Sequence, residues 1–278
     1  GGVGLFTGQL PYVWLANAFH NDGLRSSTRV CVGRIGAEPA EGSTVPPFVP
    51  GSDPESCLWP RQIPPSPFEN ARTVTVFRNG FTFPQELKFS VAADRELTSS
   101  LTASFTALFG HAINQIVLRE QNLGDPSGDP GDLSGLGGQH ERRNFGRPSR
   151  DGFDPNRLLE GYEQVLAATN ENQDWSFSFA AELRGRLSDR LGFQGGYSYA
   201  RSFDHMSLVT TDMVSNYGFA ATDRDPNDPG LRPSNFDRPH KVVASIWGAP
   251  FPGLDRTEVA LLYTGQSGLP YSYVYGDD

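Results

Sequence analysis

Apolar and polar residues alternate with a period of two in several segments from Pro84 onward, which is the pattern of β-strands with two unlike faces. The clearest case is 175–186, where Trp175, Phe177 and Phe179 alternate with serines and then with charged residues. Similar patterns predict strands within 85–94, 101–109, 191–202, 241–247 and 258–264, and residues 114–120 can be read as a continuation of the second of these. About six strands are therefore expected, each with an apolar and a polar face.

The connections between these strands alternate in length. Residues 98–100, 188–190 and 249–255 are short, whereas the inserts at 121–157 and 204–239 are long. Membrane barrels have this asymmetry, with short periplasmic turns on one rim and long extracellular loops on the other, while a soluble sandwich has no reason to sort its loops in this way. Segment 159–169 is interpreted as an extracellular extension that pairs with the beginning of the strand at Trp175.

The N-terminal part has a different character. Residues 1–83 are dense in Pro, Gly and Ser and are expected to be mostly loop, whereas 84–278 hold the strands and the two long loops of a single domain covering 1–278. Cys31 and Cys57, the two cysteines, both lie in the irregular part. In an oxidising compartment such a pair predicts a disulfide, and two free thiols are the alternative.

Charge and hydropathy narrow the class of protein. The net charge is -9, and the two lysines are Lys88 and Lys241, so no basic stripe is available for nucleic acid. No apolar run reaches about 18 residues, which excludes a transmembrane helix but not a membrane β-barrel. Because a charge facing the bilayer midplane costs about 2–4 kcal/mol, the charges inside the strands are interpreted as a solvated lumen wall. A transport path or a buried ion-pair network is the alternative. The candidate lumen-facing residues are Glu86, Lys88, Glu182, Arg184 and Arg186.

Candidate chemistry is sparse. Acidic residues cluster within 125–132 and 223–228 and at 277–278, but none of these clusters matches an EF-hand loop, so calcium binding is kept only as an alternative. The five histidines lack the spacing of zinc ligands. No catalytic constellation, metal site or cofactor site is predicted, and we expect that the protein is not an enzyme.

Several longer segments resemble the barrel of TonB-dependent outer-membrane receptors, and most closely its Oar-like subgroup, which is distantly similar to SusC-type glycan importers. The segments are PQELKFSVAADREL (84–97), the stretch 172–204, SNFDRPHKVVASIW (234–247) and TGQSGLPYSYVYGDD (264–278). The order and spacing of FDRPH and GQSGLPYS are the most specific part of the resemblance. The similarity extends over nearly the whole chain.

The resemblance implies an all-β fold: an antiparallel transmembrane β-barrel section in the outer membrane of a Gram-negative bacterium, a partial barrel with long extracellular loops. The implied function is transport, as the wall of a receptor that imports a bulky nutrient such as a glycan, a peptide or a siderophore-like molecule. The implied partners are the TonB complex, acting through a plug domain, together with outer-membrane lipid and a small-molecule or oligomeric substrate. An Oar-like adhesion or structural role is the alternative, and a soluble carbohydrate-binding sandwich is a third. Because such receptors have a plug and about 22 strands, this chain is expected to be an internal piece without the plug.

Overall fold

The computed structural model describes residues 1–20, 72–124, 146–149, 152–155, 157–159, 162–220, 222, 225–249, 251 and 257–272. The chain groups into two compact units. The first comprises 1–11, 78–119 and 168–278, and the second comprises 12–77 and 120–167. The features that bear on function lie in the first unit.

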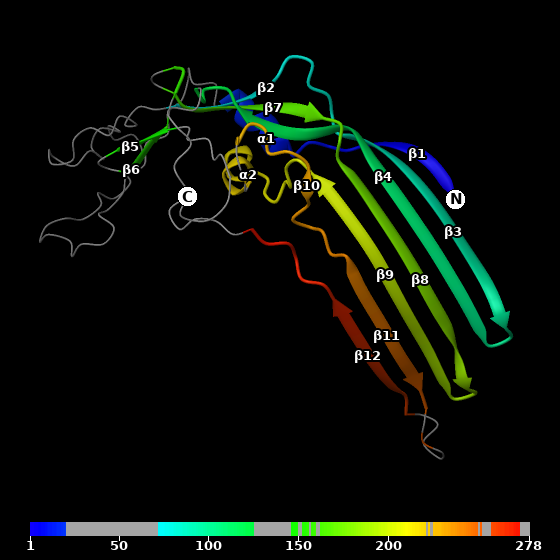
Figure 1. Cartoon of the computed structure of the whole chain (residues 1–278). Coiled ribbons are helices and arrows are strands. Elements are labelled where there is room, and N and C mark those ends of the chain that lie inside the picture. Colours follow the sequence, from blue (N-terminus) through cyan, green and yellow to red (C-terminus); the bar gives the residue numbers. More distant parts are fainter. Residues whose placement is uncertain are drawn as a thin grey trace, which may run out of the picture. The chain divides into compact units, whose positions relative to one another are not determined.

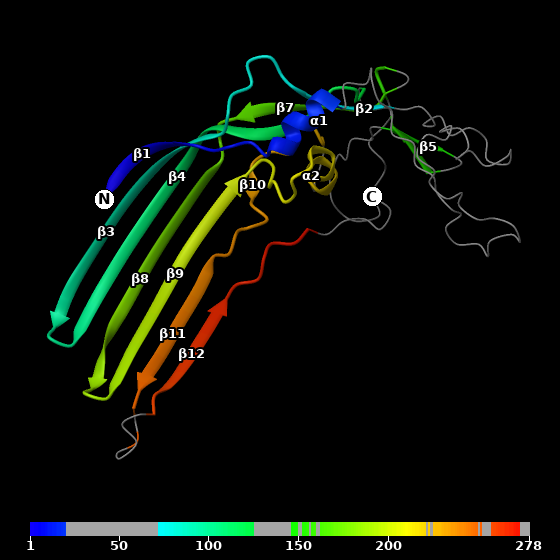
Figure 2. The same ribbon diagram turned by 180° about the vertical axis from the view of Figure 1, so that it is seen from behind.

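The first unit is built on an antiparallel sheet whose strands follow the order β1-β3-β4-β8-β9-β11-β12. Figures 1 and 2 show these strands side by side as one curved layer. Their bounds are β1 Gly2–Thr7, β3 Gln85–Thr98, β4 Leu101–Glu120, β8 Trp175–Ser188, β9 Leu191–Asp204, β11 His240–Gly248 and β12 Val259–Gln266. Every strand expected from the alternation is present, and β4 includes the proposed continuation through 114–120. The predicted all-β class is confirmed.

The strand register assigns each residue to a face, because residues directly opposite each other in a sheet point to the same side. One row runs from Asp94 through Ser104 to Glu182 and Gly196, and the parallel row on the other face runs from Ala93 through Phe105 to Ala181 and Tyr197. The large apolar side chains of the second face stay exposed to a degree unusual for a water-soluble sheet: Phe89 is 55% exposed and Leu261 68%. The sheet therefore has one apolar face and one polar face.

Connection lengths sort by end of the sheet as predicted. The turn between Thr98 and Leu101 and the turn between Ser188 and Leu191 lie at the same end. Gly248, the last residue of β11, pairs with both Leu191 and Val259, so β11 ends and β12 begins at this end too. The connections from β4 to β8 and from β9 to β11 are the long ones, and both lie at the opposite end. We refer to these as the short-turn end and the long-insert end.

Segment 159–169 was expected to pair with the strand that begins at Trp175, and this is wrong. It forms most of β7 (Tyr162–Glu171), which pairs with β4 and with β2. The last residue pair between β4 and β8 is His111 with Trp175, and β4 continues beyond it. This continuation of β4 does not pair with β8 and is available to β7. The amide of Ala112 donates to the carbonyl of Asp174 at 2.8 Å, and the Thr169 hydroxyl donates to the carbonyl of Val117 at 3.0 Å. β7 thus continues along β4 ahead of β8 instead of pairing with it.

The long insert after β9 contains two short elements, α2 (Met213–Phe219) and β10 (Arg232–Pro233). Asp212 caps the helix, because its carboxylate accepts a hydrogen bond from the amide of Ser215 at 2.8 Å. Asn216, buried in the same helix, receives the amides of Val209 and Thr210 on its side-chain oxygen. These contacts fold the insert onto itself.

The second unit holds α1 (Tyr12–His20), β2 (Arg72–Phe77), the small hairpin of β5 (Gly146–Ser149) and β6 (Gly152–Pro155), and most of β7. The expectation of mostly loop over 1–83 falls largely outside the described residues. Within the part described, β1, α1 and β2 are elements that the sequence pattern did not predict. Among the described residues, no helix has the length and apolar character that a membrane crossing requires.

Candidate functional site

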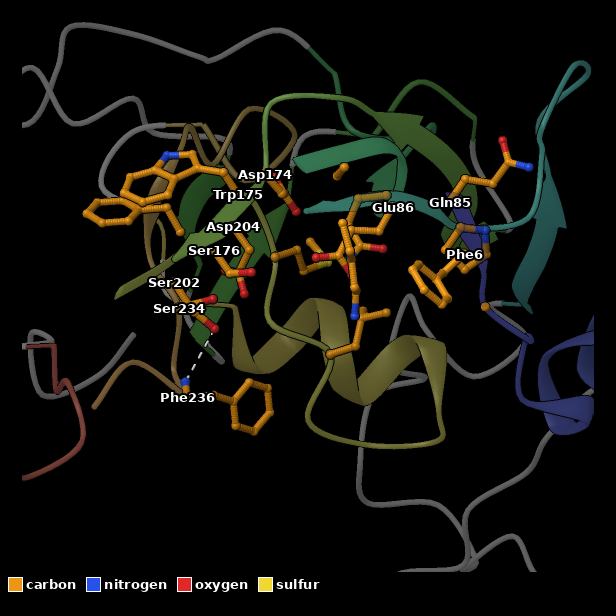
Figure 3. A pocket seen from close by; sticks show the side chains of 18 of the residues that line it. Phe6, Gln85, Glu86, Asp174, Trp175, Ser176, Ser202, Asp204, Ser234 and Phe236 are labelled. Carbon is orange, nitrogen blue, oxygen red and sulfur yellow. Dashed lines mark hydrogen bonds and ion pairs between the residues drawn. The ribbon is translucent and has the colours of Figure 1, made fainter. Parts of the chain in front are cut away.

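An open pocket of about 560 Å³ lies on the polar face of the sheet, at its long-insert end. Its walls come from the end of β1, the start of β3, the middle of β4, the start of β8 and the end of β9, together with Met206, Leu208, Ser234 and Phe236 of the long insert. Figure 3 shows its lining side chains, among them Phe6, Glu86, Asp174, Asp204 and Phe236. All of these residues belong to the first unit.

The sequence explains why these strands leave room for a pocket. Ser176 and Ser202 face the polar side, and they are paired with each other across β8 and β9. Trp175 and Phe203 are their immediate neighbours and therefore point to the opposite face. There the two rings stack with their centroids 4.8 Å apart. Small hydroxyl side chains thus lie on the pocket floor, and Trp175 and Phe203 also border the pocket.

Glu86 reaches across its neighbouring strand because position 110 has no side chain. Gly110 lies opposite both Lys88 of β3 and Ser176 of β8. A Cβ atom at this position would collide with the Glu86 carboxylate and would lie 2.8 Å from the Ser176 hydroxyl. Gly110 therefore lets the Glu86 carboxylate lie over β4, where it forms an ion pair of 3.1 Å with Lys88.

Asp174 is the most buried carboxylate of the pocket, with a side chain only 6% exposed. Its Oδ1 atom accepts from Nδ1 of His205 at 2.6 Å and from the His205 amide at 3.1 Å. Among the described residues, no group donates to its Oδ2 atom, which is also buried. Burial raises the pKa of the Asp174 carboxyl, although the hydrogen bonds and charge of His205 act in the opposite direction.

Asp204 is the third acidic residue of the lining. Both of its carboxylate oxygens accept from the Ser207 hydroxyl, at 2.9 and 2.8 Å. The Ser207 oxygen in turn accepts from the amide of Asn235 at 2.9 Å. This chain of contacts ties the end of β9 to the segment that carries Phe236.

The FDRPH motif forms a wide bulge beside β9. Pro233 pairs with Phe203 and His240 pairs with Tyr199, so six residues (234–239) lie opposite three residues of β9 (200–202). The amide of Asp237 donates to the carbonyl of Ser234 at 2.9 Å, which closes a turn. The turn presents Phe236, which is 61% exposed, to the pocket.

The side chain of Asp237 accepts hydrogen bonds where the bulge interrupts the backbone pairing with β9. This side chain is 4% exposed, and its Oδ1 atom accepts from the amide of Ser202 at 2.8 Å. Its Oδ2 atom accepts from Nε of Arg201 at 3.1 Å. A side-chain carboxylate therefore takes the place of a backbone carbonyl in the ladder, which fixes the position of the bulge.

The second motif, GQSGLPYS, lies beside the first. The amide of Ser267 donates to the carbonyl of His240 at 2.8 Å, and the amide of His240 donates to the Ser267 hydroxyl at 3.2 Å. His240 also forms a 2.8 Å hydrogen bond with the Tyr197 hydroxyl through Nδ1. The two segments that carried the family resemblance are thus joined to each other where β11 begins.

The five candidate lumen residues divide into two groups. The register places all of them on the polar face, since Lys88 lies in one row with Gly110 and Ser176, and Glu182 lies in one row with Ser104. Glu86 and Lys88 line the pocket. Glu182, Arg184 and Arg186 lie toward the short-turn end of β8 and do not belong to the pocket lining.

The two cysteines and most of the acidic clusters lie in parts of the chain that the structure does not describe. Cys31 and Cys57 lie outside the described residues, as do the acidic residues of 125–132, Asp223 and 277–278. Asp225 and Asp228 are described and form an isolated bridge. In the part of the chain that is described, no group of three or more His, Cys, Asp or Glu side chains could hold a metal ion.

Sequence reasoning missed Asp174, Asp204 and Phe236 as site residues. A signal was present for the two acids, because Asp174 directly precedes β8 and Asp204 ends β9, which is its partner strand. Charged residues that flank two paired strands at the same end must lie near each other. The presentation of Phe236 depends on the bulge, which a strand pattern does not reveal.

An exposed apolar face, a polar opposite face and loops sorted by end together define the wall of a membrane β-barrel. The chain belongs to the outer membrane beta barrel domain family, whose model matches residues 1–277. It is accordingly a protein of the Gram-negative outer membrane. No curated protein matches the chain. No solved structure matches it either.

Proposed function

We propose that the intact protein is an outer-membrane transporter of the TonB-dependent receptor type, and that this chain is a section of its wall. The observation that carries the proposal is the pocket on the polar face at the long-insert end, which joins charged, hydroxyl and aromatic groups on strands of the wall. A purely structural barrel has no need for such a set of groups, whereas an importer needs a wet, polar surface that first holds its cargo.

Transport against a gradient requires energy, which the outer membrane does not supply. We propose that the TonB complex supplies it through a plug domain, as the resemblance of the FDRPH and GQSGLPYS segments to TonB-dependent receptors implies. The cargo is a bulky nutrient. This chain acts by binding and guiding that nutrient, and we propose no catalytic role for any of its residues.

An Oar-like adhesion or structural role is the second candidate. The long inserts favour it, because two extended connections at one end of the sheet suit contact with another surface. The pocket favours transport over adhesion, because its lining lies on the polar side of the sheet.

Uptake by cells separates the two functions. Cells carrying the intact gene are given isotope-labelled peptides and glycans, and accumulation is compared in three strains: wild type, a strain lacking TonB, and a strain lacking this gene. The proposal expects accumulation of one labelled class to fall in both deletion strains. Unchanged uptake together with a loss of surface adhesion in the gene deletion would replace transport by adhesion.

A further inference from the structure

The charges of the pocket are unbalanced. Its lining includes three carboxylates, Glu86, Asp174 and Asp204, and one ammonium group, that of Lys88. The whole chain carries a net charge of -9, so the long-range field around it also favours positive ligands. Charge imbalance alone does not make a site, and the partners of each carboxylate decide what remains for a ligand.

Only one of the three carboxylates has a permanently charged partner among the described residues. Glu86 is neutralised by Lys88 at 3.1 Å. Asp204 receives a neutral hydroxyl from Ser207 on both oxygens. Asp174 is paired with His205 through Oδ1, while its Oδ2 atom is buried and lacks a donor. The side chain of Asp174 is only 6% exposed, and Figure 3 shows it directed into the pocket.

Native structures rarely leave a buried carboxylate oxygen without a hydrogen-bond donor. A ligand N–H group that donates to this oxygen forms a charge-assisted hydrogen bond, which is about twice as strong as a neutral one. Asp174 therefore favours a positively charged donor, and Asp204, whose hydrogen-bond partner is a neutral hydroxyl, adds a second negative charge that no described cation compensates.

The aromatic residues of the pocket point to the same chemistry. Nζ of Lys88 lies 5.7 Å from the centroid of the Phe6 ring, so this pocket already holds an ammonium group between a carboxylate and an aromatic face. Phe236 offers a second exposed ring on the opposite wall, from the bulge next to β9. A ring together with a carboxylate is the usual combination for binding organic cations.

We propose that this pocket binds a ligand carrying two or more ammonium or guanidinium groups, and that the imported nutrient is a basic peptide. The proposal rests on the transport function proposed above and specifies its substrate class. Asp174 and Asp204 bind the cationic groups, Phe236 packs against the ligand, and Lys88 weakens binding because it competes for Glu86.

The test uses the intact protein in detergent micelles and isothermal titration calorimetry with three probes of similar size: trilysine, triglutamate and maltotriose. Trilysine is expected to bind at least about tenfold more tightly than the other two, and its affinity is expected to fall as salt is raised. Equal or tighter binding of triglutamate or maltotriose would overturn the proposal.

Two substitutions with opposite expected signs sharpen the test. Asp204→Asn keeps an acceptor for Ser207 but removes the charge, and is expected to weaken trilysine binding about tenfold. Lys88→Gln frees the Glu86 carboxylate and is expected to strengthen binding severalfold. Asp94→Asn, on the same polar face but outside the pocket lining, is the matched control and is expected to leave affinity unchanged. Weaker binding in Lys88→Gln, or no effect of Asp204→Asn in a folded protein, would refute the assignment.

These binding measurements and the uptake experiment fail independently. TonB-dependent uptake of a glycan, with no preference for trilysine in calorimetry, would refute the cationic substrate and leave transport standing. Tight trilysine binding without any TonB-dependent uptake would refute transport and leave the binding site standing.

Discussion

At the short-turn end of the sheet, Asp94, Glu182 and Arg184 form no ion pair with any other residue that the structure describes, although all three lie on the polar face. At the long-insert end, by contrast, acidic side chains are held by named partners: Glu86 by Lys88, Asp174 by His205, and Asp237 by Arg201. Both ends are formed by the same strands. The alternation of faces is thus enough to build the wall, whereas the pocket requires individual contacts.

At the short-turn end, only the choice of face should matter. Phe105→Arg places a charge on the apolar face near the middle of the crossing and is expected to lower the free energy of unfolding by about 2–4 kcal/mol. Ser104→Arg places the same charge on the polar face and is expected to change it by less than about 0.5 kcal/mol. Urea unfolding of the intact protein in phospholipid vesicles measures both. Equal effects of the two substitutions would mean that the apolar face does not contact lipid.

At the long-insert end, a single polar contact should matter. Asp237→Ala leaves the Ser202 amide and the Arg201 guanidinium without their carboxylate, and is expected to cost about 2–3 kcal/mol. The amide of Ser202 should also exchange faster with deuterium. Asp94→Ala, at the other end, serves as the control and is expected to change stability by less than about 0.5 kcal/mol. An ordinary hydrogen bond contributes about 1 kcal/mol to stability. If Asp237→Ala lowers the free energy of unfolding by less than about this amount, the bulge does not depend on the Asp237 carboxylate.

The contrast should also appear in the dependence on pH. Because burial raises the pKa of Asp174, the folded protein holds this proton more tightly than the unfolded chain does. Its contribution to stability is therefore greatest below the ordinary carboxyl value of 3.8 and is lost as the pH rises through the raised folded value. The loss amounts to about 1.4 kcal/mol for each unit by which the pKa is raised. Asp174→Asn should flatten this part of a plot of Tm against pH, and Asp94→Asn should leave it as in the wild type.

The smallest effect is expected for the unpaired charges of β8. Glu182→Gln and Arg184→Gln should each change the free energy of unfolding by less than about 0.5 kcal/mol, as is usual for solvated charges without a fixed partner. The same urea titration applies. A cost above about 1 kcal/mol would instead support a buried ion-pair network, which the sequence left open as an alternative.

The strands could be predicted because their alternation is a direct consequence of facing two different environments. β8 shows it along its whole length, and β3 and β9 show it along most of theirs, with Arg95 and Arg201 as exceptions on the apolar face. β1 was missed because Gly2 and Gly4 alternate with Val3 and Leu5, so size alternates and polarity does not.

The pairing of β7 with β4 was missed because both strands contain an unbroken apolar run instead of an alternating pattern. Ile116, Val117 and Leu118 of β4 are consecutive and all buried, and so are Leu166, Ala167 and Ala168 of β7. An unbroken apolar run indicates a strand covered on both faces, unlike the alternating part of the same strand. The pocket was harder still, since the bulge and the reach of Glu86 over Gly110 depend on pairs of residues far apart in the sequence.

The length of β4 has a consequence for the rate of ligand capture. Its 20 residues would extend over roughly 68 Å at about 3.4 Å per residue, whereas a tilted crossing of the apolar band takes about ten. The pocket borders β4 at Ala112 and Gln115, beyond a crossing that starts at the short turn. If the chain transports a cationic ligand as proposed, with the long inserts outside the cell, the ligand meets the acids of the pocket by diffusion through external water before any membrane crossing begins. The encounter rate then depends on the electrostatic attraction of the pocket and falls with ionic strength, independently of the slower steps that follow.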